Sequence, residues 1–244
     1  MSSVAPYRSV FLCWQVISRQ LVTRGRLLGL SSLSTLLVLI SWLVGRDSRS
    51  FEALEIAVEF VANFGFTVLV PLACLIFASA SLGDTREDGT LVYLWLRPMS
   101  RYSVVAGAWL ASASISIPLT IVPMGLAAIF LDAGGSFVVT TILSTLLAAF
   151  AYCALFVFIG LLVKNSVLWG LVYVIVWEGL VATWSSGAAK LAIRGYARSM
   201  LTERTGVTLD VGSVSQSAAV AGLILISIGF LMISGIRLNR LEVE

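Results

Sequence analysis

The sequence predicts an all-α polytopic membrane protein, and three features support this fold class. Of the 244 residues, 59% are hydrophobic and only 12% are charged, about half the charged share of soluble domains. The mean hydropathy is +0.99. Apolar stretches recur that are long enough to cross a hydrocarbon core of roughly 30 Å. We therefore expect a single transmembrane domain over residues 1–244, built from helices whose backbone groups bond internally.

The residue types that are missing exclude several kinds of chemistry. There is no histidine, which rules out Ser-His-Asp and Cys-His catalysis and HExxH zinc chemistry. Cys13, Cys74 and Cys153 lie far apart in the sequence and form no disulfide pattern. Neither lysine follows a glycine, so a Walker A loop is absent. We expect no catalytic residue, no metal and no cofactor in this chain.

Residues 1–26 are predicted to form an amphipathic helix at the membrane surface. Apolar residues recur there at spacings of three and four, and arginines lie on the opposite face. The apolar residues are Tyr7, Val10, Phe11, Trp14, Ile17 and Leu21. The alternative is that this segment is only the positively charged flank of the first span.

Six transmembrane helices are expected after this segment. They cover residues 27–44, 57–82, 102–131, 137–163, 167–184 and 216–236. Pro71 in the second span and Pro118 and Pro123 in the third are expected to tilt or bend these helices, and a break in the third is one outcome. The remaining parts are a cytoplasmic segment 83–101, an external segment 185–215 and a tail 237–244.

The positions of the basic residues predict the orientation. With six spans, both ends of the chain share one side of the membrane, and that side holds ten of the sixteen lysines and arginines. Because positive residues are retained on the cytoplasmic side, we expect both termini to be cytoplasmic in a plasma (inner) membrane. The net charge of +3 is thus a topology signal, and no nucleic-acid partner is expected.

The segment 83–101 contains a short apolar helix outside the membrane. Residues 91–96 form an apolar run with charged residues on both sides. Arg97 ends this run because the residue before a proline is displaced from helical geometry. The pattern fits a ridge that docks on another protein, or a helix that lies on lipid.

The same segment resembles the ABC-2 type permease family. The shared order is acidic–Gly–Thr–Leu, then a few apolar residues, then Arg–Pro–x–Ser–Arg, between the second and third spans. The residues that carry this order are Glu87, Asp88, Gly89, Thr90, Leu91, Arg97, Pro98, Ser100 and Arg101. The sequence Trp177–Glu178–Gly179 near the outer end of the fifth span also resembles such permeases.

The resemblance implies the membrane subunit of an ATP-binding-cassette transporter, usually an exporter. Two permease subunits, as a homodimer or a heterodimer, would pair within the membrane lipids, and two separate ATPase subunits would bind ATP and Mg²⁺. The segment 83–101 would be the coupling helix. The residues expected to dock the ATPase are Glu87, Asp88, Gly89, Thr90, Leu91, Leu94, Trp95, Arg97, Pro98 and Arg101.

Three polar residues in the spans are candidates for a pathway or gate. Glu59 and Asn63 share one helix face, where they would line an external vestibule or belong to a solvated first turn. Glu178 would act as a gate or would tie the fifth span to the external segment. The external segment also carries basic residues at every fourth position, Lys190, Arg194 and Arg198, which indicate a short surface helix. Their pairing with the stripe formed by Glu52, Glu55, Glu59 and Asn63 is an open alternative.

Two other functions fit parts of the pattern. An ATP-independent secondary transporter would account for ionisable residues within the spans. A membrane anchor for a partner complex would use the same docking ridge. The presence of a bound P-loop ATPase would separate the transporter subunit from both.

Overall fold

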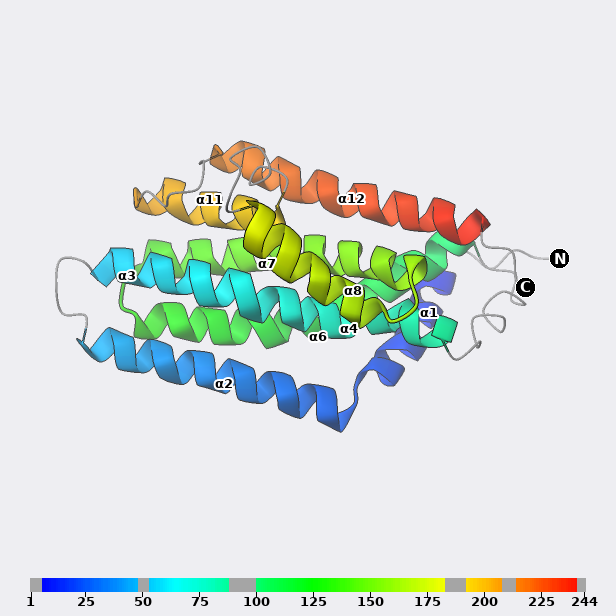
Figure 1. Cartoon of the computed structure of the whole chain (residues 1–244), viewed down its shortest axis with the longest axis horizontal. Coiled ribbons are helices and arrows are strands. Elements are labelled where there is room, and N and C mark those ends of the chain that lie inside the picture. The colour runs from blue at the N-terminus through cyan, green and yellow to red at the C-terminus, as the bar shows by residue number, and fades with distance from the viewer. Residues whose placement is uncertain (1–5, 48–52, 88–99, 183–191, 208–213, 241–244) are drawn as a thin grey trace.

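The computed structural model describes residues 6–47, 53–87, 100–182, 192–207 and 214–240. These ranges are helical apart from short turns, and the long helices lie side by side along one axis (Figure 1). In an apolar chain this arrangement satisfies the backbone N–H and C=O groups within each helix, which is the requirement that a bilayer imposes. The prediction of an all-α fold is confirmed for the part that the structure describes.

The described residues contain five helices that are long and apolar enough to cross a membrane. The first is α2 (Arg24–Asp47). The second is a continuous run of α3 (Ala53–Phe60), the π-helical segment η1 (Val61–Leu69) and α4 (Val70–Glu87). The others are α6 (Arg101–Phe130), α7 (Gly135–Leu162) and α12 (Gln216–Arg240). The chain is therefore a multi-pass membrane protein, and its described residues form helices and short turns.

The expected fifth span differs from the other five. It consists of α8 (Ser166–Val172) and a second π-helical segment, η2 (Tyr173–Val181). The described part of this span, Ser166–Val181, is apolar and is about 24 Å long at 1.5 Å per residue. A separate helix, α11 (Ile193–Thr205), lies further along the bundle beside α7 and α12 (Figure 1).

The observed second and third spans differ from the predicted ones at their ends and around their prolines. Helix α4 continues to Glu87, beyond the expected boundary at residue 82. Helix α6 contains Pro118 and Pro123 without a break. In the second span, the π-helical segment ends just before Pro71, and the N–H of Val70 donates to the carbonyl of Gly65 five residues earlier. In a regular α-helix, a proline ring crowds the carbonyl oxygen four residues before it. The π-helical bonds here link residues five apart instead of four, and this wider turn makes room for the ring of Pro71.

Helix α7 lies at the centre of the bundle and packs against α4, α6, α11 and α12. Large side chains along it, including Phe137, Tyr152 and Phe156, are fully buried. Its contact with α4 is close at Gly160, where a Cβ would lie 2.7 Å from the carbonyl oxygen of Ser79. The absence of a side chain at this position allows the two backbones to approach.

The amphipathic segment forms helix α1 (Pro6–Leu21), which packs across α6. Cys13, Ile17 and Leu21 are buried against the bundle, whereas Tyr7 and Phe11 remain exposed. Helix α1 lies at the same end of the bundle as the end of α4, the start of α6 and the end of α12 (Figure 1). The turn between α6 and α7 lies at the opposite end.

Candidate functional site

Seven polar side chains from four helical segments meet at one place in the apolar bundle, and all of them except Asn63 are buried or half-buried. We call this group the polar cluster, and its members are Asn63 and Thr67 on η1, Tyr152 on α7, Tyr173 and Glu178 on η2, and Arg194 and Arg198 on α11. Both π-helical segments of the described structure contribute to it. Segments of π-helix are rare in proteins, and those that occur are often found at functional sites.

The carboxylate of Glu178 is held by two tyrosines. Its side chain is only 1% exposed. The hydroxyl of Tyr152 donates to Oε2, and the hydroxyl of Tyr173 donates to Oε1 at 3.3 Å. A charged carboxylate at the centre of a membrane helix costs about 2.5–3.5 kcal/mol on insertion scales, so the two phenol donors replace part of the lost hydration.

Arg194 connects the two π-helical segments. It is 6% exposed, and its guanidinium donates to the main-chain carbonyl of Glu178 on η2. The same guanidinium donates to Oγ1 of Thr67 on η1 at 3.3 Å. One side chain of α11 therefore ties together two segments that the sequence separates by more than a hundred residues.

Arg198 makes the widest set of contacts in the cluster. Nε and Nη2 donate to the carbonyl of Ala62 at 3.3 and 3.2 Å, and Nη2 also donates to Oδ1 of Asn63 at 2.7 Å and to Thr67 at 3.3 Å.

The cluster lies near the middle of the bundle. Tyr152 is the eighteenth residue of the 28-residue helix α7, and Thr67 is the fifteenth of the 34-residue second span. Glu178 bonds to Tyr152, so it lies deeper than its expected position near the outer end of the fifth span. The polar cluster thus contains two guanidinium groups, one carboxylate and neutral oxygen atoms.

The structure brings two of the three predicted pathway residues together. Asn63 and Glu178 both belong to the polar cluster and are connected through Thr67, Arg194 and Arg198. Glu59 shares a helix face with Asn63, and both residues are exposed, but Glu59 is not a member of the cluster.

Most of the predicted docking residues lie outside the described ranges. These are Asp88, Gly89, Thr90, Leu91, Leu94, Trp95, Arg97 and Pro98. Glu87 is the last residue of α4, and Arg101 is the first of α6. The described boundaries of the docking segment are therefore the ends of two membrane-spanning helices.

Basic side chains connect these two helix ends to the rest of the bundle. Arg86 donates to the carbonyl of Leu161 at the end of α7 at 2.8 Å. Arg101 donates to the carbonyl of Leu238 on α12 at 2.9 Å. Arg26 forms an ion pair with Asp84 at 2.8 Å, so this end of α4 is also bound to α2. Displacement of the docking segment would therefore act on three further helices.

Sequence reasoning did not find the two tyrosines or Thr67. No spacing marks them, because single polar residues in apolar helices commonly bond to their own helix or face lipid. The four-residue spacing of Arg194 and Arg198 indicated a helix, but as a surface element, whereas both side chains reach into the bundle. Among the described residues, no group of His, Cys, Asp and Glu is arranged to hold a metal ion.

Comparison with protein-family models and with curated proteins finds no match to this chain.

Proposed function

We propose that this chain is the membrane-spanning permease subunit of an ABC-2 type transporter, an exporter driven by separate ATPase subunits. In this proposal two copies of the ATPase bind ATP and Mg²⁺, and the permease pairs with a second permease subunit in the plasma (inner) membrane. The chain crosses six times with both ends in the cytoplasm. The resemblance of residues 87–101 to the coupling segment of such permeases supports the proposal.

The observation that carries the proposal is how the ends of the docking segment are bound. Arg86 and Arg101 border this segment and bond to the carbonyls of Leu161 and Leu238. An ATPase that moves residues 88–99 would thus pull directly on α4 and α6 and, through these bonds, on α7 and α12. Rigid-body motion of packed helices is a common way to transmit such a displacement.

The polar cluster supplies a gate in this mechanism. The cluster joins α11 to η2 of the expected fifth span and to η1 of the second span. Separation of Arg194 and Arg198 from η1 and η2 would free α11 to move, which opens the outer half of the pathway.

The test is to purify the tagged protein from its native membrane in mild detergent and to measure both bound proteins and ATP hydrolysis. We expect a stoichiometric P-loop ATPase. The double variant Leu94→Ala/Trp95→Ala should reduce its recovery by about tenfold or more, because two large apolar contacts are removed from the interface.

A matched control is available on α8. Leu168 and Trp169 are also an adjacent exposed Leu–Trp pair, and Leu168→Ala/Trp169→Ala removes the same atoms away from the docking segment. The control should retain the ATPase. Equal recovery with the docking variant and the wild type would contradict the proposal.

An ion-coupled secondary transporter is the second candidate, and the polar cluster is the specific observation that favours it. Ionisable groups near mid-depth in membrane helices are typical of such carriers. In this case no ATPase would be recovered, and transport by vesicles would depend on an imposed ion gradient. Glu178→Gln would abolish that dependence while preserving the fold.

A further inference from the structure

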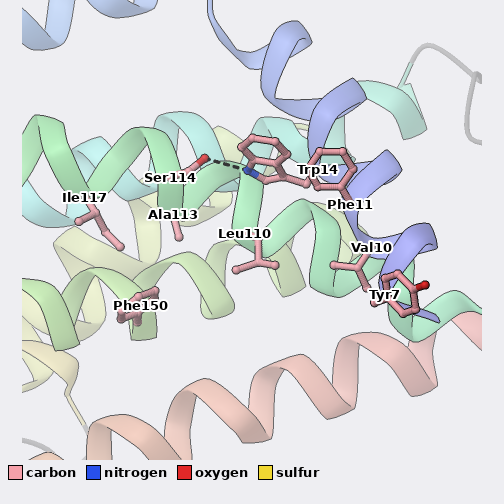
Figure 2. Close-up of a pocket in the computed structure, with 9 residues that line it drawn as sticks. All are labelled: Tyr7, Val10, Phe11, Trp14, Leu110, Ala113, Ser114, Ile117 and Phe150. Carbon is pink, nitrogen blue, oxygen red and sulfur yellow. Dashed lines mark hydrogen bonds between the residues drawn. The ribbon is translucent and has the colours of Figure 1, made fainter. Parts of the chain in front are cut away.

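A second feature of the structure is an apolar groove beneath helix α1. It has a volume of about 530 Å³ and lies between α1, α6 and α7. Its main walls are Tyr7, Phe11, Trp14, Leu110, Ile117 and Phe150. Figure 2 shows the side chains of α1 at one end of the groove and Ile117 and Phe150 at the other.

The groove is suited to hydrocarbon and not to a polar molecule. Its walls are aromatic and aliphatic apart from one polar pair, in which Nε1 of Trp14 donates to Oγ of Ser114 at 3.2 Å (Figure 2). Because these atoms satisfy each other, a bound molecule is not required to supply a hydrogen bond to them. Burial of apolar surface is the main driving force that such walls offer.

The length of the groove matches part of one acyl chain. Leu110 and Ile117 are seven residues apart on α6, about 10 Å along the helix axis. The hydrocarbon of one leaflet is about 15 Å thick, half of the roughly 30 Å core. A single chain that runs beside α6 would therefore have most of its length within the groove.

A positively charged side chain lies beside the groove, next to Tyr7. Arg8 is exposed on α1, and its guanidinium carbon lies 6.0 Å from the ring centroid of Tyr7, which lines the groove. Helix α1 also carries Arg19 in its last turn, and its sequence contains no acidic residue. A phosphate-bearing headgroup at this mouth would find a cation and no competing carboxylate on α1.

We propose that this groove binds one acyl chain of an anionic phospholipid, with the lipid phosphate at Arg8. The site holds α1 in place on the bundle by filling the space beneath its aromatic side chains. The inference depends on α1 lying at the membrane surface and does not depend on an ATPase. Recovery of the ATPase without lipid selectivity, or the reverse, therefore distinguishes the two proposals.

The test is native mass spectrometry of delipidated protein with dioleoyl phosphatidylglycerol or dioleoyl phosphatidylcholine. The two lipids have the same chains and differ in headgroup charge. We expect one phosphatidylglycerol per chain bound about fivefold more tightly than phosphatidylcholine, the change that one arginine near a phosphate supplies. Arg8→Gln should remove this preference. Arg240→Gln, also exposed at the same end of the bundle but on α12, should retain it.

Two further variants fill the groove and leave its charge unchanged. Leu110→Trp and Ile117→Phe should each reduce the occupancy of phosphatidylglycerol at least threefold, whereas Leu225→Trp on the exposed face of α12 should not. Thermal unfolding of each variant shows that it is folded. A second readout is the quenching of Trp14 fluorescence by brominated phosphatidylglycerol, measured as wild type minus Trp14→Phe.

Three outcomes would overturn the proposal. The first is equal binding of the two lipids by the wild type. The second is retention of phosphatidylglycerol by both folded groove-filling variants. The third is a change of oligomeric state in those variants with no loss of lipid, which would assign the groove to a second copy of the chain.

Discussion

Arg198 on α11 donates two hydrogen bonds to the main-chain carbonyl of Ala62, a residue 136 positions earlier in the π-helical segment η1. This carbonyl also accepts from the hydroxyl of Thr67 at 3.1 Å. A backbone oxygen inside a membrane helix is normally used by its own helix. Here it also anchors a separate helix, so the position of α11 depends on the conformation of η1.

This contact predicts that Arg198→Lys lowers the free energy of unfolding by about 1–2 kcal/mol. Lysine retains the charge but has a single nitrogen, and it cannot reach Ala62, Asn63 and Thr67 together. The measurement is denaturant unfolding in micelles followed by circular dichroism. Arg204→Lys is the control, because Arg204 is exposed and bonds only to the side chain of Gln216 among the contacts described. Equal losses for both variants would show that the contacts of Arg198 contribute nothing.

The hydrogen bond from Tyr152 to Glu178 predicts that a substitution of Tyr152 will partly rescue the loss of the Glu178 carboxylate. Glu178→Leu leaves the fully buried Tyr152 hydroxyl without its acceptor, at a cost of about 1–3 kcal/mol. Adding Tyr152→Phe removes the unpaired hydroxyl, so the double variant should be more stable than Glu178→Leu alone. Glu178→Gln should lose less than Glu178→Leu, because its amide keeps an acceptor oxygen. If adding Tyr152→Phe to Glu178→Leu does not raise the free energy of unfolding, the hydrogen bond between these two side chains does not contribute to stability.

The close contact between α1 and α6 predicts that one methyl group added at Gly107 will destabilise the protein. A Cβ at Gly107 would lie 2.5 Å from Cβ of Cys13 and 3.1 Å from the carbonyl oxygen of Val10. Gly107→Ala should therefore destabilise the protein by about 1–3 kcal/mol and increase maleimide labelling of Cys13, which is normally buried.

The matched control for this prediction is Gly29→Ala in α2. No atom lies within 4 Å of a Cβ at Gly29, so the same substitution should be neutral or stabilise by up to about 1 kcal/mol. Unchanged Cys13 labelling in Gly107→Ala would mean that α1 does not depend on this close contact.

The proposed orientation predicts opposite accessibility of two helix turns. Asp132 lies in the turn between α6 and α7, and Lys164 lies in the turn between α7 and α8. Both side chains are exposed. In intact cells a membrane-impermeant maleimide should label Asp132→Cys and should label Lys164→Cys only after the membrane is opened. The wild type is the control, because its three cysteines are buried. The reverse pattern would place both termini outside.

The long helices could be predicted closely from the sequence because the bilayer imposes a simple condition on it. Apolar residues must continue for the thickness of the membrane, and that length is visible in one dimension. The prediction 216–236 lies within α12 (Gln216–Arg240), and 137–163 matches α7 (Gly135–Leu162) within two residues. Of the expected fifth span, 167–184, the structure describes the residues up to Ala182, as α8 and η2.

The polar cluster could be predicted only in part. Glu178 and Asn63 were recognisable because polar residues in apolar helices are costly. Their partners were not, because Tyr152 and Thr67 resemble ordinary span residues and the arginines of α11 resemble a surface pattern. Which of these side chains meet depends on how the helices rotate and pack, and sequence spacing along one helix does not contain that information.

The sequence by itself determined that this protein is helical and crosses a membrane several times, because its apolar surface cannot be hidden in water and its backbone must bond internally in lipid. The tertiary structure alone decided that α11 packs inward, with Arg194 bonded to the carbonyl of Glu178 and Arg198 to that of Ala62. The physical reason is that a buried guanidinium needs several fixed oxygen atoms. Only packed helices from distant parts of the chain bring those oxygen atoms together.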